Sequence, residues 1–445
     1  MLNDPLQIEK YIRRNYPRFG VNKLQQISRL AYEIAKREKV SFKGLFPQDK
    51  SEEKENFSKI KSRLLLRRYP GLSLEESLSA AHLPDIDINH RYRQKIGKRV
   101  EIDFTEVFIE KDVADSELAI HVRKLFPKAE YKTISLYRDH IKGKDFSLAD
   151  YNQRLKKLFL VKENFDFILD CPCTKDAVGC GYNILNLGMG CGYECVFCFL
   201  QSYTNSPGIV LPANIGDFFL KLQESKKPLR IGSGQFTDSL MFDHITNYSK
   251  GIVEFFNNHQ KHTFEFKTKS DNVGLLLSQK PRGNILVSWS VNPQPIIDDN
   301  EFYTAPLGKR LEAAAKCAKA GYGIGFHFDP IIYYLGWERA YCDVIEQIFM
   351  KIPQESIKWI SLGCLRMTTA QKQAIENRFP ENKILDGELI LGFDNKLRYT
   401  FDLRREIYKK MHGWIRSCNR EVSVYLCMEE KKMHESALIP SMDWH

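Results

Sequence analysis

The chain has 445 residues, enough for two or three domains, and its 43% hydrophobic and 27% charged content is ordinary for a globular protein. No apolar run approaches the roughly 18 residues that a bilayer-spanning helix needs, and the N-terminal segment lacks the pattern of a secretion signal. We therefore expect a cytoplasmic protein that makes no use of a membrane.

Positive charge is concentrated near the N-terminus. Residues 1–100 hold 22 Lys and Arg against 12 Asp and Glu, an excess that equals the net charge of +10 for the whole chain. This imbalance indicates an anionic partner, and nucleic acid, DNA above all, is the first candidate. Solvated charges on the outside of a helical domain are the alternative.

Residues 1–97 are predicted to form this basic helical domain, because apolar residues recur at helical spacing between Pro, Gly and Asp segments. The helical segments are residues 7–16, 23–39, 55–69 and 73–82. Residues 98–180 mix a β-rich run (99–111) with helical patterns at 115–126 and 148–160. We expect them to form an α+β segment that leads into the next domain.

From residue 181 short apolar strands alternate with amphipathic helices, the pattern of a parallel sheet built from βα units. The predicted strands are residues 183–188, 229–234, 263–269, 284–291, 321–328 and 357–363. Six units predict a partial (β/α)6 barrel over residues 181–380, followed by a C-terminal α/β extension over 381–445. In such folds the chemistry lies at the carboxyl ends of the strands.

A cysteine loop, GMGCGYECVFCFLQ, follows the first predicted strand. Its glycines permit a tight turn in which the thiolates of Cys191, Cys195 and Cys198 can converge. Zinc usually takes four protein ligands, whereas a [4Fe–4S] cluster held by three cysteines leaves one iron open. That iron could bind S-adenosylmethionine (SAM), whose reductive cleavage gives a 5′-deoxyadenosyl radical.

A zinc knuckle is the alternative reading of this loop, with Cys171, Cys173 or Cys180 as its fourth ligand. Those three upstream cysteines could also be buried thiols or part of an auxiliary metal site. Eleven cysteines, six of them within residues 171–198, indicate metal binding rather than a secreted disulfide framework.

At these residues the chain resembles the spore photoproduct lyase-like radical SAM family. The resemblance runs from about residue 100 to about 435 and leaves out the basic helical N-terminus. The matching segments are GCGYECVFCFLQ (190–201), RIGSGQFTDSL (230–240), FKTKSDNV (266–273), SWSVNP (288–293), GFHFDPIIYYLGWE (325–338), WISLGCLR (359–366) and YLCMEE (425–430).

The resemblance implies that residues at successive strand ends contact SAM. Gly232, Ser233 and Gly234 would approach its methionine group through exposed backbone. Lys269 would lie near the methionine carboxylate, and Ser290 would hydrogen-bond the cofactor. A flavodoxin- or ferredoxin-type protein would supply electrons to the cluster.

The resemblance also implies a reaction, from which this sequence departs at two places. In the family the adenosyl radical opens a methylene-bridged thymine dimer, a cysteine returns a hydrogen atom, and tyrosines relay the radical back to SAM. Here the segment after the second strand has no thiol, and Phe197 and Phe199 stand where the tyrosines are expected. We therefore expect SAM to be consumed rather than regenerated.

Polar and aromatic residues near the other strand ends are candidates for the substrate side. Arg366 could bind a phosphate through two N–H groups, and His327 could transfer protons near neutral pH. Asp238 follows the second strand, and Tyr334 or Cys364 could replace the missing hydrogen donor. The further candidates are Ser239, Asp329, Tyr333 and Trp337.

Three functions from different classes fit these patterns. The first is a radical SAM enzyme that acts on nucleic acid, as a lesion-repair lyase. The second is a radical SAM enzyme with a peptide or small-metabolite substrate. The third is a non-catalytic nucleic-acid-binding protein stabilised by a metal.

Overall fold

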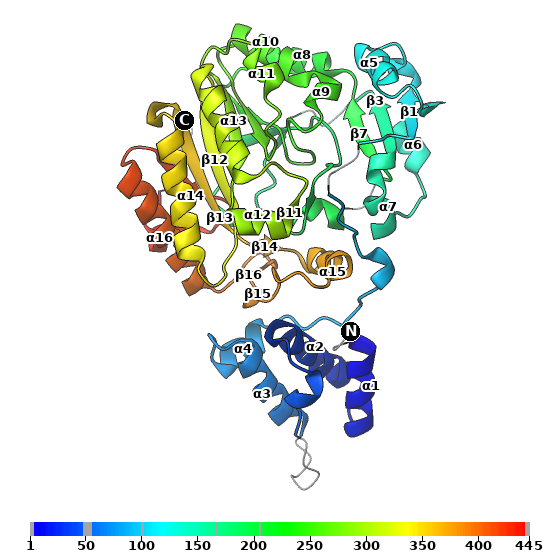
Figure 1. The fold of residues 1–445 in the computed structure, drawn as a ribbon, viewed down its shortest axis with the longest axis vertical. Coiled ribbons are helices and arrows are strands. Elements are labelled where there is room, and N and C mark those ends of the chain that lie inside the picture. Colours follow the sequence, from blue (N-terminus) through cyan, green and yellow to red (C-terminus); the bar gives the residue numbers. More distant parts are fainter. Residues whose placement is uncertain (1–3, 48–55, 99–101, 165–167, 204–205, 441–445) are drawn as a thin grey trace. The chain divides into compact units, whose positions relative to one another are not determined.

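The computed structural model describes residues 4–47, 56–98, 102–164, 168–203 and 206–440. The chain forms two compact units, drawn in Figure 1. One unit contains residues 1–93 and 366–400, and the other contains residues 94–365 and 401–445. In the described ranges no helix is both long enough and apolar enough to cross a membrane.

The first unit begins with four helices that enclose one apolar core, as the periodicity of the sequence predicts. Asp4 and Asn56 accept hydrogen bonds from backbone N–H groups at two of the helix starts, and Ser73 forms a capping box with Glu76 at a third. The helices are α1 (Pro5–Asn15), α2 (Val21–Glu38), α3 (Phe57–Arg68) and α4 (Leu74–Ala80). Their core consists of side chains three and four residues apart, such as Ile8, Ile12, Leu24, Ile27, Ile60 and Leu64.

Residues 366–400 complete this unit. They form α15 (Thr369–Arg378) and an antiparallel sheet of β14 (Arg366–Met367), β16 (Leu397–Tyr399) and β15 (Leu389–Leu391). The sequence pattern predicts that residues 366–380 belong to the barrel and residues 381–400 to a C-terminal extension. The structure instead groups them with the N-terminal helices, because buried charged side chains join the two segments.

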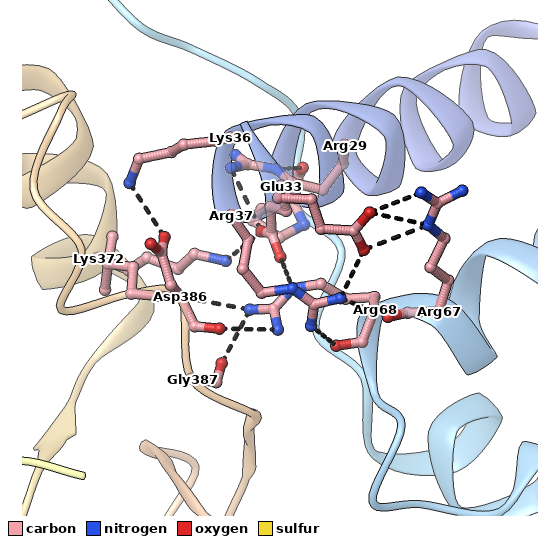
Figure 2. Close-up of polar contacts among 12 residues, drawn as sticks. Arg29, Glu33, Lys36, Arg37, Arg67, Arg68, Lys372, Asp386 and Gly387 are labelled. Carbon is pink, nitrogen blue, oxygen red and sulfur yellow. Dashed lines mark hydrogen bonds and ion pairs between the residues drawn. The ribbon is translucent and has the colours of Figure 1, made fainter. Parts of the chain in front are cut away.

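Glu33 on α2 is the centre of that buried charge cluster (Figure 2). Its carboxylate accepts from Lys372 Nζ at 2.7 Å and from Arg68 Nε at 2.8 Å, and Arg29 donates to Glu376 at 2.6 Å. Burial acts to raise the pKa of Glu33, but the three cations outweigh it and lower that pKa below its usual range. Arg29 and Arg68 therefore hold the unit together and are not part of its basic surface.

The second unit is built on an eight-stranded sheet that curls into a half-barrel (Figure 1). The strand order is β17-β13-β12-β10-β9-β8-β5-β4, and every pair is parallel except β4 with β5. The strands are β4 (Ile168–Asp170), β5 (Tyr182–Leu185), β8 (Arg230–Gly232), β9 (Thr263–Thr268), β10 (Ile285–Ser290), β12 (Gly323–Ile331), β13 (Ile357–Cys364) and β17 (Ser423–Leu426). All six predicted strands are present, and the predicted partial barrel is confirmed.

Helices alternate with these strands as the βα pattern requires. α13 packs against β10 and β12, and α14 packs against α13 and α16. The helices are α8 (Ile215–Glu224), α9 (Asp243–Thr246), α10 (Tyr248–Asn258), α11 (Gly274–Leu277), α12 (Gln294–Asn300), α13 (Leu307–Lys319), α14 (Trp337–Lys351), α16 (Phe401–Cys418) and α17 (Lys431–Ala437). Helices are thus found between the strands of the barrel, as the alternating pattern predicts.

A separate four-stranded parallel sheet is built from strands that lie on both sides of the cysteine loop in the sequence. Its order is β2-β1-β3-β7, with β1 (Glu106–Glu110), β2 (Glu130–Ile134), β3 (Lys157–Val161) and β7 (Ile209–Pro212). α5 (Glu117–Leu125), α6 (Tyr137–Ile141) and α7 (Leu148–Asn152) connect the first three strands. The helix predicted over 148–160 ends early, because the apolar run from Leu158 to Val161 forms β3, a strand buried in this sheet.

Candidate active site at the carboxyl ends of the barrel strands

The cysteine loop leaves the carboxyl end of β5 through two glycines that adopt positive φ. A Cβ at Gly188 (φ +149°) would lie 2.7 Å from the carbonyl oxygen of Val210, and one at Gly190 (φ +94°) would lie 2.7 Å from Ile209. Gly190 N–H donates to the Phe236 carbonyl at 2.9 Å. The glycines thus let the backbone run closely between β7 and the turn after β8.

The far side of the loop is held by a short antiparallel pair. β6 (Glu194–Cys195) pairs with β11 (Glu301–Phe302), so that Cys195 lies opposite Glu301. Val196 N–H donates to the Asn300 carbonyl at 2.9 Å, and Cys198 N–H donates to the Cys195 carbonyl at 3.0 Å. Cys195 and Cys198 therefore lie on backbone that is fixed by hydrogen bonds.

Arg154, from the turn before β3, binds the same loop from inside the protein. Its guanidinium donates to the carbonyl oxygens of Cys191 (2.6 Å) and Tyr193 (2.8 Å) and to the Glu194 carboxylate (2.6 Å). Both charged side chains are at most 4% exposed. A planar guanidinium suits this set of acceptors, which a lysine could not satisfy together.

The thiols of the loop sit in surroundings that favour the neutral form. Burial raises the pKa of Cys191 to about 12, with Asp238 and Cys198 adding to the effect. Burial also raises the pKa of Cys195 far above its usual value, although Lys269 acts in the opposite direction. A bound metal cluster would supply the positive charge that converts these thiols to thiolates.

This set of donors fits an iron–sulfur cluster. Three thiols on one glycine-shaped loop can each ligate a different iron of a cubane, and so need not meet at one point. Within the described ranges, no three His, Cys, Asp or Glu side chains surround a point that could hold a single metal ion. A zinc knuckle would need a fourth ligand from Cys171, Cys173 or Cys180, which precede β5, whereas the loop follows it.

Lys269, just after β9, is aimed at the loop by a buried acid. Its Nζ lies 2.9 Å from Glu301 Oε1, which also accepts from Asn292 at 2.9 Å, while Arg310 donates to Glu301 Oε2 at 2.7 Å. Burial acts to raise the pKa of Glu301, but Lys269 and Arg310 lower it to about 2. Arg310 also donates to the Ser290 carbonyl at 2.8 Å, so one network fixes the ends of β9 and β10.

Asp238 organises the turn after β8. Its carboxylate accepts from the backbone N–H groups of Leu240, Met241 and Lys269 and from the hydroxyl of Thr268, at 2.7–3.0 Å. Burial raises the pKa of Asp238, and these four bonds act against that rise. Its lone pairs are used in holding the turn against the end of β9.

Comparison with known proteins identifies the family to which this arrangement belongs. The family profile described as spore photoproduct lyase matches residues 170–400, just over half of the chain, including the cysteine loop and β5 to β13. The chain belongs to the spore photoproduct lyase family. The resemblance seen in the sequence is confirmed.

Individual relatives agree with this assignment. The chain is 32% identical over 236 residues to the spore photoproduct lyase of Bacillus subtilis (strain 168) and 30% identical over 206 residues to that of Geobacillus sp. (strain Y412MC61). These matches cover 50% and 44% of this chain, and 66% and 60% of the two relatives. The chain thus spans somewhat less than two thirds of either relative.

Solved structures of the family share the fold. Spore photoproduct lyase complexed with dinucleoside spore photoproduct matches with a TM-score of 0.62 at 23% identity, over 73% of this chain and 98% of that one. A mutant spore photoproduct lyase with bound AdoMet and dinucleoside spore photoproduct matches with a TM-score of 0.62 at 22% identity, over 74% and 99%.

The family's expected SAM contacts occupy the end of β8 and the turn after it. A Cβ at Gly232 would lie 1.7 Å from the hydroxyl of Tyr182, and Gly234 (φ +97°) would place one 2.7 Å from the Lys267 carbonyl. Ser233 Oγ lies 2.7 Å from Ser239 Oγ. The structure brings this segment, Lys269 and Ser290 to neighbouring strand ends; their contacts with SAM stay predictions.

His327 lies inside the barrel and not at its mouth. Its ring bonds Glu265 at 2.7 Å and Ser361 at 2.5 Å, and Glu265 is within 3.4 Å of Arg230 Nη2. Burial lowers the pKa of His327, with Lys267 acting in the same direction and Glu265 against it. For Glu265, burial acts to raise the pKa, but His327 and Arg230 lower it to about 2.

The other substrate candidates are scattered. Arg366 lies on β14 in the first unit. Cys364, at the end of β13, is buried, and its N–H donates to the Tyr408 hydroxyl at 2.8 Å. Tyr333 is 44% exposed and its ring lies 6.1 Å from that of Trp337. The hydroxyl of Tyr334 is buried and has no hydrogen-bond partner among the residues that the structure describes. Their catalytic roles remain predictions.

Sequence reasoning missed several residues of the site. Asn186, Gln235 and Thr237 follow the ends of β5 and β8, and each has a buried side-chain oxygen that accepts no hydrogen bond from the described residues. Such atoms are the ones that a polar ligand satisfies. Glu265 had a visible signal, because it is an acid within the apolar strand TFEFKT.

Proposed function

We propose that this protein is a radical SAM enzyme of the spore photoproduct lyase family that acts on a nucleic-acid lesion. The observation that carries the proposal is the three-cysteine loop at the carboxyl end of β5, in a chain that belongs to this family. Cys191, Cys195 and Cys198 would hold a [4Fe–4S] cluster, which when bound supplies the electron that cleaves SAM to a 5′-deoxyadenosyl radical. A flavodoxin- or ferredoxin-type protein would deliver that electron.

The chain's own residues would position SAM. Lys269, held by Glu301, would present its ammonium to the methionine carboxylate, and the backbone of residues 232–234 would accept or donate hydrogen bonds to the methionine group. Ser290, fixed through its carbonyl by Arg310, would orient the rest of the cofactor. The orphaned oxygens of Asn186, Gln235 and Thr237 would receive hydrogen bonds from cofactor or substrate.

The substrate class rests on relatives and on charge. A family structure contains dinucleoside spore photoproduct, and the basic N-terminal unit suits a phosphate backbone. A lesion in duplex DNA would have to leave the base stack to reach the barrel. A cytoplasmic location, where thiols stay reduced, belongs to the same proposal.

Two phenylalanines indicate what happens to SAM. Phe197 lies 5.5 Å from the Lys269 ammonium, and Phe199 packs against Tyr203 and Phe236. Neither ring has an O–H bond that could return a hydrogen atom to the cofactor. SAM would therefore be consumed, with one 5′-deoxyadenosine released in each turnover.

Anaerobic assays test this proposal. The reduced protein should release 5′-deoxyadenosine faster with UV-irradiated DNA than with unirradiated DNA, irradiated RNA or no substrate. Cys195→Ala should lose this activity, whereas Cys342→Ala, on α14, should keep it. Stimulation by peptides or metabolites alone would favour a different substrate, and a colourless protein without SAM cleavage would favour a non-catalytic binder.

A further inference from the structure

Four cysteines outside the cluster loop gather where one segment crosses between the edge strands of the half-barrel. Cys171, Cys173 and Cys180 lie between β4 and β5, and Cys427 follows β17 at the other edge of the sheet. All four are reduced and, like the rest of the barrel, belong to the second unit. The proposed radical chemistry uses none of them.

Backbone pairing brings the two segments together. Ala177 forms an antiparallel bridge with Glu430, and Val178 N–H donates to the Glu429 carbonyl at 2.9 Å. Cys180 packs against the buried cluster that contains Tyr425, two residues before Cys427. The segment from 171 to 181 therefore runs from the β4–β5 edge to the β17 edge.

The chain holds Cys427 and Cys171 in place on either side. Glu429 accepts hydrogen bonds from Tyr408 and Arg404, both on α16, and Cys427 N–H donates to the Leu362 carbonyl at 2.8 Å. Cys171 N–H donates to the Tyr182 carbonyl at 2.9 Å, and Cys173 N–H turns back to the Cys171 carbonyl at 2.7 Å.

One pair of sulfur atoms has the separation that a shared metal requires. Cys171 Sγ and Cys173 Sγ are 3.7 Å apart. Two thiolates on one tetrahedral zinc, each about 2.3 Å from the ion, lie roughly 3.8 Å apart. The hydrogen bond from Cys173, burial, and then the thiols of Cys173, Cys427 and Cys180 raise the pKa of Cys171, so all three of these thiols influence the ionisation of Cys171.

This group is distinct from the cluster loop. Cys171 is opposite Tyr182, at the amino end of β5, whereas Cys191 follows the carboxyl end of the same strand. The upstream cysteines are therefore at the wrong end of β5 to be a fourth ligand of the loop.

We propose that Cys171, Cys173, Cys180 and Cys427 form a second, structural metal site that takes a thiophilic divalent cation such as Zn²⁺. Within the described ranges no three ligands yet surround one point, so binding requires Cys180 and Cys427 to turn their thiols toward the Cys171–Cys173 pair. The bound ion would fasten the crossing segment to β17 and close that side of the half-barrel. Deprotonation of four thiols would accompany binding.

Metal binding by a full-length variant without the cluster loop's thiols tests the proposal. Replacing Cys191, Cys195 and Cys198 by Ala removes the other thiolate site, and this background should still bind one Zn²⁺ per chain. With Co²⁺ it should give the intense sulfur-to-metal charge-transfer bands and visible d–d bands of tetrahedral thiolate coordination. Adding Cys427→Ser should weaken Zn²⁺ binding at least tenfold, whereas adding Cys342→Ser should leave it unchanged.

Thiol labelling is a second test, which does not require the Cys427→Ser variant to fold. In the background variant, Zn²⁺ should protect four cysteines from alkylation, identified by mass spectrometry as residues 171, 173, 180 and 427. A background variant that binds no Zn²⁺ or Co²⁺, or a Cys171–Cys173 disulfide that forms equally with and without metal, would overturn the proposal. These readouts do not involve SAM cleavage, so they are independent of the proposed function.

Discussion

Arg154 lies inside the protein with its guanidinium directed at the backbone of the cysteine loop. It is the partner of the buried Glu194 and also binds two loop carbonyls. Breaking a buried ion pair on one side leaves an uncompensated charge, a change that usually costs about 3–5 kcal/mol. The loop that would receive the cluster is thus stabilised by a residue outside the conspicuous motif.

We expect Arg154→Met to lower the free energy of unfolding by about 3–5 kcal/mol and to reduce the iron bound per chain after reconstitution. Urea unfolding and iron and sulfide assays measure the two effects. Lys156→Met, two residues away and exposed, is the matched control and should change neither. Full iron loading in Arg154→Met would show that the loop keeps its shape without this anchor.

The carboxylate of Glu301 makes the stability of the protein depend on pH. Its pKa is about 2 in the folded state against an ordinary value of 4.5, so folding favours the ionised form. The resulting stabilisation, about 3 kcal/mol, is present above pH 4.5 and is lost as the pH falls toward 2. At pH 3 about 2 kcal/mol of it should be gone.

The comparison of wild type with Glu301→Gln isolates this effect from other acids. The difference in unfolding free energy between them should shrink by about 2 kcal/mol from pH 7 to pH 3, because the wild-type carboxylate takes up a proton. Urea titrations at pH 7, 5 and 3 measure it. A difference that stays constant with pH would mean that Lys269 and Arg310 do not hold Glu301 ionised.

At the scale of elements, the entry to the cysteine loop depends on one close approach of backbone to backbone. Gly188 combines φ +149° with a Cβ position 2.7 Å from the Val210 carbonyl, a group that β7 holds in place. Gly188→Ala should therefore destabilise the loop by more than about 1 kcal/mol and lower cluster content. Gly216→Ala on α8, where a Cβ meets nothing within 4 Å, should be neutral or slightly stabilising in the same urea and iron assays.

The strands of the barrel could be predicted because each is a short apolar run between turns. The whole of β10, Ile285–Ser290, is buried, and such runs are recognisable locally. β17 was not predicted, because it is only four residues long and its first residue is exposed. Residues 148–160 were predicted to form one helix, because the apolar residues that follow Leu155 fit a helical pattern as well as the buried strand that they form.

The candidate site likewise has one part that the sequence reveals and another that it does not. Three cysteines on one loop are visible in the sequence, whereas Glu301, Arg310 and Arg154 reach that loop from distant segments. Cys180 and Cys427 are far apart in the sequence, and the hydrogen bond from Val178 to Glu429 brings their two segments together. Contacts between remote segments are set by tertiary packing, which periodicity does not encode.

At the scale of the whole molecule, the basic N-terminal helices share their unit with residues 366–400. Deleting residues 1–97 would remove Glu33 and Arg29, the buried partners of Lys372 and Glu376. Weaker DNA binding by such a truncation would then reflect unfolding as much as the removal of phosphate-binding side chains. Substituting exposed charges is the sharper experiment, because it leaves the cluster of Figure 2 intact.

One face of α1 and the turn after it offers such charges. Lys10, Arg13 and Arg14 are spaced three and four residues apart, opposite the buried Ile8 and Ile12. With Arg18 they form an exposed basic group, which we call the α1 basic face. Arg13 pairs with Glu9 at 2.9 Å, but its side chain stays 64% exposed. Little free energy is therefore lost when this ion pair is exchanged for one with a phosphate.

Replacing the α1 basic face with glutamines should weaken DNA binding and its response to salt together. Each phosphate that the protein no longer neutralises reduces the slope of log affinity against log salt by about 0.9, so four phosphates account for about 3–4. Fluorescence anisotropy with a UV-irradiated duplex at salt concentrations from about 50 to about 200 mM would measure both. The matched control replaces four exposed lysines of the second unit, Lys226, Lys227, Lys316 and Lys319. If the control lowers the slope and the α1 variant does not, the phosphates lie along the barrel unit, and the positive charge of the N-terminal helices serves solubility.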